Sequence, residues 1–187
     1  MPGNERLTAL TGAVLLVLSL VELFTVPVLR DPTALWVHLV VGVLLGGPVL
    51  LKIASTGYRF LRYYTGSPAY VAKGPPRLLP RILSPLLIVA TVALIATGIG
   101  LALLPPGQSG PLRPLHHASF VLWLVLLAIH VAIYARRVPG LIRADWRSTE
   151  PLRVPGRAAR TTANVAALAI GAAAAVVLYP AFAAWVR

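Results

Sequence analysis

Five long apolar runs restrict the folds that are open to this chain. They cover residues 7–29, 33–54, 82–104, 115–135 and 162–185. About 20 apolar helical residues cross the ~30 Å hydrocarbon core of a bilayer, so each run is long enough to span it once. A soluble domain carries about 25% charged residues, whereas this chain carries 12%. The sequence therefore predicts an all-α transmembrane helical bundle with five spans.

The runs group into a single membrane domain, 1–187, in which no separate soluble part is expected. It divides into a four-helix core at 7–137, a basic loop at 138–161 and a fifth, C-terminal helix at 162–185. The first run is not expected to be a cleaved signal peptide, because its apolar part is too long and its only basic flank is Arg6.

The basic residues fall mostly on one side of the predicted bundle. The chain has 17 Lys and Arg against 5 Asp and Glu, a net charge of +12. With five spans, only Arg30, Arg113 and Arg187 fall on the side opposite the N-terminus. This positive-inside pattern predicts a cytoplasmic N-terminus and an external C-terminus, rather than nucleic-acid binding. Contact with anionic membrane lipid explains the same charge, as would an acidic partner docked on 55–81 and 136–161.

Two further features of the composition bear on location and chemistry. Arg greatly outnumbers Lys and Ala is abundant, which is typical of a GC-rich bacterial genome, so we expect a bacterial cytoplasmic membrane. The chain has no cysteine, which excludes disulfides, cysteine-ligated iron–sulfur clusters and covalently attached haem.

Three histidines recur at matching positions in the second and fourth runs. His116 and His130 are fourteen residues apart, about 40° short of four full helical turns, so nearly one face presents both. The two runs cross the membrane in the same direction, because one run lies between them. His38 and His116 are therefore expected at similar depth near the outer surface. Two imidazoles that face each other at one depth can occupy both axial positions of a haem iron.

Gly42 and Gly46 follow His38 at intervals of one helical turn. A ridge without side chains beside an axial ligand leaves room for a flat porphyrin against the helix. The same ridge would equally suit the close packing of two membrane helices.

The inner end of the pattern is incomplete. Fourteen residues after His38 the second run has Lys52, so the partner of His130 in an inner site would be a lysine. As a neutral amine, Lys52 is a candidate ligand of a second haem. A lysine near a helix end more commonly extends to the lipid headgroups, and we favour this interpretation. His130 would then bind a haem with another ligand or with none, or be a structural histidine.

Three other polar residues of the runs have open roles. His117 either replaces His116 as the axial ligand or contacts a haem propionate, and we favour the second role. Arg113 is placed to meet a propionate, or else faces water and headgroups. Glu22 is the only acid well inside a run. It is part of a proton path or quinone contact, or is a protonated or hydrogen-bonded side chain packed on Ser, Thr or a ligand histidine.

Ligands about fourteen residues apart on two parallel helices resemble those of the membrane b-type cytochromes, over residues 7–137. That family includes the cytochrome b of quinol-oxidising complexes and the cytochrome subunits of formate dehydrogenases and hydrogenases. The resemblance implies haem b held by His38 and His116. A second haem would use His130 and Lys52 as metal ligands, with lysine in the place of the family's histidine. It also implies electron transfer with a quinone and a redox partner subunit, rather than a self-contained enzyme.

A different class of protein also fits these residues. In a cofactor-free transporter or assembly protein, the intramembrane histidines and Glu22 would form a proton relay. Five spans are few for an inverted-repeat transporter, and the sequence lacks a pair of broken helices. A relay also does not require a common fourteen-residue spacing on two helices. We therefore expect a cytochrome.

Overall fold

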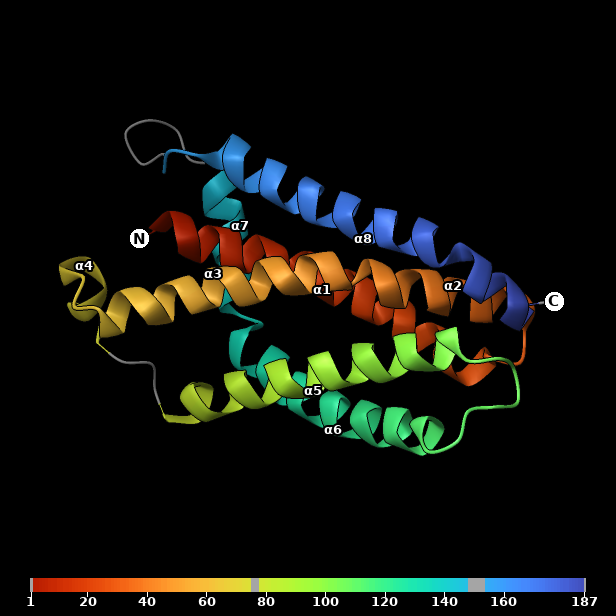
Figure 1. Ribbon diagram of the computed structural model, residues 1–187. Coiled ribbons are helices and arrows are strands. Elements are labelled where there is room, and N and C mark those ends of the chain that lie inside the picture. Colours follow the sequence, from red (N-terminus) through yellow and green to blue (C-terminus); the bar gives the residue numbers. More distant parts are fainter. Residues whose placement is uncertain (1, 75–77, 148–153, 187) are drawn as a thin grey trace.

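Helices joined by short turns and loops make up the residues that the structure describes, and no strand occurs among them (Figure 1). The computed structural model describes residues 2–74, 78–147 and 154–186. The elements are α1 (Pro2–Thr25), the 3-10 turn η1 (Val26–Val28), α2 (Pro32–Leu44), α3 (Gly46–Tyr64), α4 (Pro68–Val71), α5 (Leu78–Leu103), α6 (Leu112–Tyr134), α7 (Arg137–Arg147) and α8 (Arg157–Val186). Five stretches of the described chain are long and apolar enough to cross a membrane: α1 with η1, α2 with α3, α5, α6 and α8. The predicted all-α transmembrane bundle is confirmed.

The second span is longer than predicted and contains a break. α2 and α3 form one run of 33 residues from Pro32 to Tyr64, so the helix continues ten residues beyond the predicted end of the span at residue 54. At about 1.5 Å per residue this run is roughly 50 Å long, and its end projects beyond a ~30 Å hydrocarbon core. α2 gives way to α3 at Leu45, one turn before Pro48, whose missing N–H leaves one helical hydrogen bond unmade.

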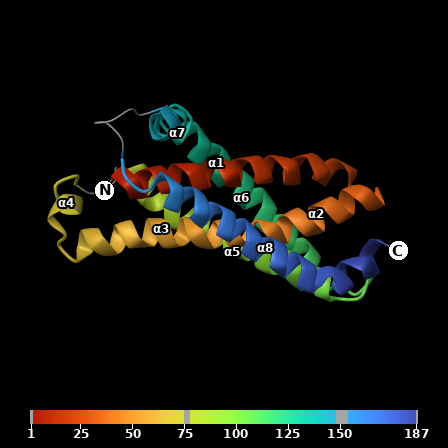
Figure 2. The same ribbon diagram turned by 90° about the horizontal axis from the view of Figure 1, so that it is seen from above.

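The two predicted basic loops are partly helical, which was not expected. The first loop contains the end of α3, the single-turn α4 and the start of α5, and the second contains α7 and the start of α8. Arg77 and Arg153 lie outside the described residues, as does Arg187. α7 is amphipathic, and Figures 1 and 2 show it crosswise to the spans at the end of the bundle that holds the N-terminus. A helix in the membrane interface adopts this placement.

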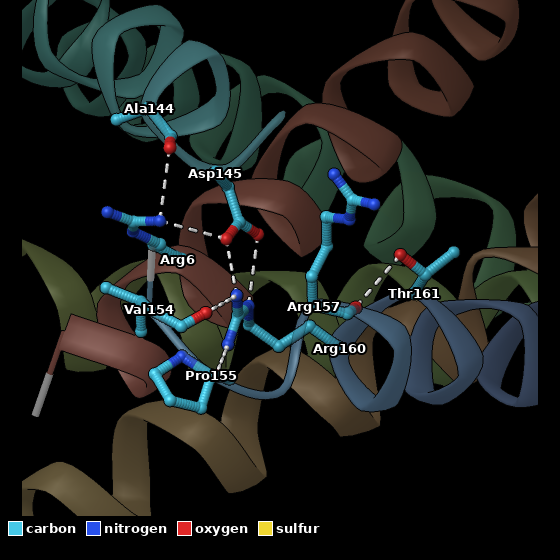
Figure 3. Close-up of polar contacts among 8 residues, drawn as sticks. All are labelled: Arg6, Ala144, Asp145, Val154, Pro155, Arg157, Arg160 and Thr161. Atoms are coloured by element: carbon cyan, nitrogen blue, oxygen red, sulfur yellow. Dashed lines mark hydrogen bonds and ion pairs between the residues drawn. The ribbon is translucent and has the colours of Figure 1, made fainter. Parts of the chain in front are cut away.

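An ion-pair cluster attaches α7 to α1 and α8 (Figure 3). Asp145 of α7 is buried and pairs with Arg160 of α8 and with Arg6 of α1, the latter at 3.1 Å. The contact with Arg160 is two-pronged, because its Nε donates to Asp145 Oδ2 at 3.0 Å while Nη2 donates to Oδ1. Burial alone would raise the pKa of Asp145, but hydrogen bonds from Arg160 and Arg6 outweigh burial and hold that pKa below its ordinary value.

α8 packs closely on both halves of the second span. A Cβ at Gly47 would lie 1.8 Å from the carbonyl oxygen of Ala167. A Cβ at Gly171 would lie 2.3 Å from the carbonyl oxygen of Leu44. Neither glycine can therefore carry a side chain, and backbone approaches backbone as in small-residue contacts between membrane helices.

α5 and α6 form an antiparallel pair that is partly separate from the other helices. In Figure 1 this pair lies below the layer of α1, α2 and α3, and α8 lies above that layer. α5 contacts α2 and α8 as well as α6. Trp123 of α6 is buried, and its Nε1 donates to Thr91 Oγ1 of α5 at 3.1 Å. The principal contact of α6 is thus with α5, and its other side is left to line a cavity.

Apolar side chains also cover the outside of the bundle. Phe24 and Val177 are each 76% exposed, and Val89 is 66% exposed. Apolar surface of this extent suits contact with lipid tails rather than with water. The two termini lie at opposite ends of the bundle in Figure 1, as five crossings require. These are the features of a multi-pass membrane protein.

Candidate functional site

A large, partly open cavity lies mainly between α1, α2, α3, α5 and α6. Its volume is about 2240 Å³, compared with about 300–1,000 Å³ for an ordinary ligand pocket. It extends along the bundle, because Arg30 and Trp185 line one end and Arg59 and Lys73 line the other. Of the residues singled out from the sequence, the lining includes His38, Gly42, Lys52, Arg113, His116, His117 and His130. Gly46 is not part of the lining, and a Cβ there would meet no atom within 4 Å.

One end of the cavity brings together two of the predicted histidines. We call it the two-histidine end, meaning Glu22, Thr25, His38, Thr97, Gly98 and His116. The ring centres of His38 and His116 are 6.4 Å apart, and the ring planes are inclined at 87°. A metal ion between two imidazoles, with bonds of roughly 2 Å, separates the ring centres by about 6 Å. The spacing of the rings would therefore allow both imidazoles to bind one metal ion between them.

Hydrogen bonds to both rings determine where their protons lie. His38 Nδ1 is 2.5 Å from Glu22 Oε2 and 3.0 Å from Thr25 Oγ1. The Thr25 hydroxyl already donates to the Glu22 carbonyl at 2.7 Å, so it can only accept from the ring. His116 Nδ1 is 3.1 Å from Thr97 Oγ1, whose hydrogen is likewise given to Ala93 O at 2.7 Å. Both rings thus carry the proton on Nδ1 and have a free lone pair on Nε2.

Gly98 allows the His116 ring to take this position. A Cβ at Gly98 would lie 3.0 Å from Cε1 of His116 and 3.5 Å from its Nδ1, closer than most Cβ contacts. A side chain at Gly42 would be less crowded, because a Cβ there would lie 3.7 Å from Glu22 Oε1, an ordinary van der Waals distance. The absence of a side chain is therefore needed at Gly98 more than at Gly42.

The other end of the cavity holds the predicted lysine. We call it the lysine end, meaning Thr8, Gly12, Lys52, His130 and Tyr134. Lys52 Nζ donates to the backbone carbonyl of Thr8 at 2.6 Å, and a Cβ at Gly12 would lie 2.9 Å from Nζ. The amine therefore points across the bundle onto α1. It does not extend toward headgroups from a helix end, because α3 continues twelve residues further, to Tyr64.

His130 has a different hydrogen-bond pattern from His38 and His116. Its Nδ1 is buried and has no hydrogen-bond partner among the described residues, while its ring lies 4.7 Å from that of Tyr134. A buried N–H without an acceptor is rarer and costlier than a bare acceptor atom. The proton of the neutral ring therefore belongs on Nε2, the nitrogen that is not shut off from the cavity. At this end the histidine presents a donor rather than a lone pair.

His117 and Arg113 lie at the mouth of the two-histidine end. Both are exposed and both line the cavity from the first turns of α6. They are positioned to meet an acidic group of a ligand that enters there.

Several residues of the site were not identified from the sequence. Thr97 and Gly98 fit the general pattern of small residues at membrane helix contacts, but nothing in that pattern assigns them to a binding site. Thr25 belongs to no recognisable sequence motif. Glu22 was singled out as an intramembrane acid with Ser, Thr or a ligand histidine as its candidate partners, and the structure places it beside His38. These residues come from α1 and α5, whereas the histidines come from α2 and α6. Their contact depends on how four helices pack.

Comparison with known proteins adds no assignment to this geometry. No protein-family model, no characterised protein and no solved structure matches the chain. The residues of the cavity themselves must therefore indicate what the protein binds.

Proposed function

We propose that the protein is a membrane b-type cytochrome that holds one non-covalently bound haem b between His38 and His116. The observation that carries this proposal is the ring pair, 6.4 Å between centres with both Nδ1 atoms hydrogen-bonded. Two protein ligands complete a haem iron, whereas a structural zinc site needs four. The residues present therefore fit a haem better than a metal ion held by protein alone.

The haem would supply a one-electron iron couple, and the chain supplies its binding and surroundings. His38 and His116 would hold the iron through their Nε2 lone pairs. Glu22, Thr25 and Thr97 hold the two rings in the tautomer that ligation needs. The apolar lining excludes water, and Arg113 and His117 at the mouth are suited to pair with propionates. The absence of cysteine agrees with binding without a covalent link.

The lysine end offers less support for a second haem. Its Lys52 Nζ is engaged by the Thr8 carbonyl, and the accessible nitrogen of His130 is the protonated one. Among the described residues, neither Lys52 nor His130 has a side-chain partner of the kind that orients each histidine at the other end. We therefore propose one haem, with ligands His38 and His116.

We further propose that electrons pass within or across a bacterial cytoplasmic membrane, between a quinone and a redox partner subunit. The concentration of basic residues on the side of the N-terminus supports a cytoplasmic N-terminus. Haem chemistry alone does not provide a substrate reaction, so a partner would complete the system. The protein would then act as an electron-transfer subunit rather than as a self-contained enzyme.

The test is to measure haem bound by the purified protein after expression with added haem precursor. The wild type should retain one haem per chain, with the sharp reduced-minus-oxidised bands of a six-coordinate b-type cytochrome. His38→Ala and His116→Ala should each lower haem affinity at least about tenfold. His130→Ala, at the lysine end, is the matched control and should retain haem, and His117→Ala should keep the six-coordinate spectrum. A wild type without haem, or loss only in His117→Ala, would reject the proposal.

One observation favours a second candidate function. The contact of 2.5 Å between Glu22 Oε2 and His38 Nδ1 is the kind of acid–histidine pair that a proton relay uses. A cofactor-free transporter with such a relay would bind no haem. Its activity would appear as proton flux in vesicles, lost in Glu22→Gln, and the haem measurement distinguishes the two functions.

A further inference from the structure

The lysine end of the cavity contains a cation without a matching anion. Lys52 lies inside the bundle, on the cavity wall, and only one of its three N–H donors has an acceptor among the described residues, the Thr8 carbonyl. No carboxylate of the described chain lies within ion-pair distance of Nζ. A charge in an apolar interior is costly unless it is paired and hydrogen-bonded. The uncompensated ammonium therefore favours a bound anion.

A second donor faces the same space. His130 presents its protonated Nε2 to the cavity because Nδ1 is buried. Lys52 is close enough to act electrostatically on this ring. Two N–H donors that converge on one space suit an acceptor with two oxygens, such as a carboxylate.

The charges around this end are also predominantly positive. Besides Lys52, the lining at this end includes the basic residues Arg59, Lys73, Arg81, Arg137 and Arg143. Glu5 is the one acid among the described lining residues there, and it is paired with Lys73 at 2.5 Å and with Arg137 at 3.6 Å. Arg59 and Arg143 have no ion-pair partner among the described residues. An anion approaching from this end would therefore be attracted.

Beyond these donors the cavity wall is apolar. Leu16 of α1, Ile88 of α5 and Leu127 of α6 line it between the two ends. The cavity volume of about 2240 Å³ exceeds that of an ordinary ligand pocket more than twofold, so a haem at one end leaves space at the other. An alkyl chain that lies along this wall would be buried without unsatisfied polar groups.

We propose that the lysine end binds the carboxylate of a long-chain fatty acid, with its alkyl chain in the apolar part of the cavity. Lys52 Nζ and His130 Nε2 each donate a hydrogen bond to the carboxylate. A phospholipid is a poorer fit, because Lys52 Nζ points into the bundle onto the Thr8 carbonyl of α1 rather than toward the surrounding headgroups. The inference does not depend on the haem.

The experiment measures equilibrium binding of radiolabelled palmitate to the full chain in nanodiscs of a zwitterionic lipid, corrected for nanodiscs without protein. Palmitate should bind at one site per chain, and hexadecanol of equal chain length should bind far more weakly. Lys52→Met should weaken palmitate binding roughly 10–100-fold, and His130→Phe roughly tenfold. Lys52→Arg keeps the charge and should retain binding, as should Arg30→Met at the opposite end of the cavity. Haem content and thermal unfolding of each variant show whether it has folded.

Three outcomes would overturn the proposal. Equal binding of hexadecanol and palmitate would mean that the cavity is merely apolar. Displacement of palmitate by phosphatidylglycerol, with the same dependence on Lys52, would assign the site to a lipid headgroup. Two haems per chain, one of them lost in His130→Ala, would place a haem at this end. A wild type that binds palmitate through Lys52 but no haem would leave this inference standing and reject only the proposed cytochrome.

Discussion

The two ends of the cavity are built on the same two helical runs but have opposite chemistry. α6 contributes a histidine to each end, His116 and His130, fourteen residues apart. The second span contributes His38 to one end and Lys52 to the other, with the same spacing. At the two-histidine end both accessible nitrogens have lone pairs, whereas at the lysine end both are donors. A common spacing therefore brings side chains to matching depths without making the two sites equivalent.

The difference arises from the neighbouring helices. α1 gives an acid and a hydroxyl to the two-histidine end, Glu22 and Thr25, but only a backbone carbonyl to the lysine end. α5 gives Thr97 to His116, and no described residue does the same for His130. Metal-binding histidines depend on such orienting partners. This comparison leads to three predictions.

The largest expected effect comes from the ion-pair cluster that attaches α7 to α1 near the lysine end. Asp145→Ala should lower the free energy of unfolding by about 3–5 kcal/mol, because it leaves the buried Arg160 without its carboxylate. The measurement is denaturant unfolding in mixed micelles, followed by circular dichroism. If the two ends are independent, the folded fraction should keep its haem spectrum while palmitate binding declines. A haem loss as large as the palmitate loss would contradict that independence.

The dependence of stability on pH tests the same ion-pair cluster. The pKa of Asp145 lies below the ordinary aspartate value of 3.8, so its carboxylate contributes stability at neutral pH. That contribution should stay constant as the pH falls to about 5. It should be lost only as the pH falls through the lowered pKa, when Asp145 takes up a proton. Asp145→Ala should lack this part of the acid transition, and an identical transition in both proteins would exclude Asp145 as its source.

The second prediction concerns the acid that distinguishes the two-histidine end. Glu22→Ala should weaken haem binding roughly 10–100-fold, because His38 loses the carboxylate that orients its ring. Glu22→Gln keeps a hydrogen-bond acceptor and should retain more haem. The measurement is haem titration of the apoprotein, followed by absorbance. Thr8→Val at the lysine end is the matched control and should not change haem affinity, since Lys52 bonds only the Thr8 backbone.

The smallest expected effect comes from a single methyl group. Gly98→Ala places a Cβ 3.0 Å from Cε1 of His116, so the ring must shift by a few tenths of an ångström. Overpacking of one methyl group costs about 1 kcal/mol, at the low end of the usual range, which should appear as a roughly fivefold loss of haem affinity. Gly46→Ala is the control, because its Cβ meets no atom within 4 Å. Equal effects of the two substitutions would show that only helix flexibility matters.

The fold was largely predictable, because in a bilayer each spanning helix is specified by the composition and length of its own segment. Apolar runs of spanning length appear in the sequence directly, and helices are the one way for a single run to satisfy its own backbone within lipid. The helix ends were less predictable. α3 continues to Tyr64 and α7 forms at Arg137–Arg147, in polar segments that the hydrocarbon core does not constrain.

The sequence by itself determined five spans and the matching depths of His38 and His116, since both follow from length and helical period. Only the tertiary structure decided which ring nitrogen of each histidine is hydrogen-bonded and which is left for a ligand. Glu22 lies sixteen residues before His38, and Thr97 lies nineteen before His116. Neither contact follows from a period within one helix. The tertiary structure also decided that Lys52 points inward onto α1, where it donates to the Thr8 carbonyl. The missing side chain at Gly12 of α1 leaves space for the amine, and the sequence of α3 does not indicate this contact.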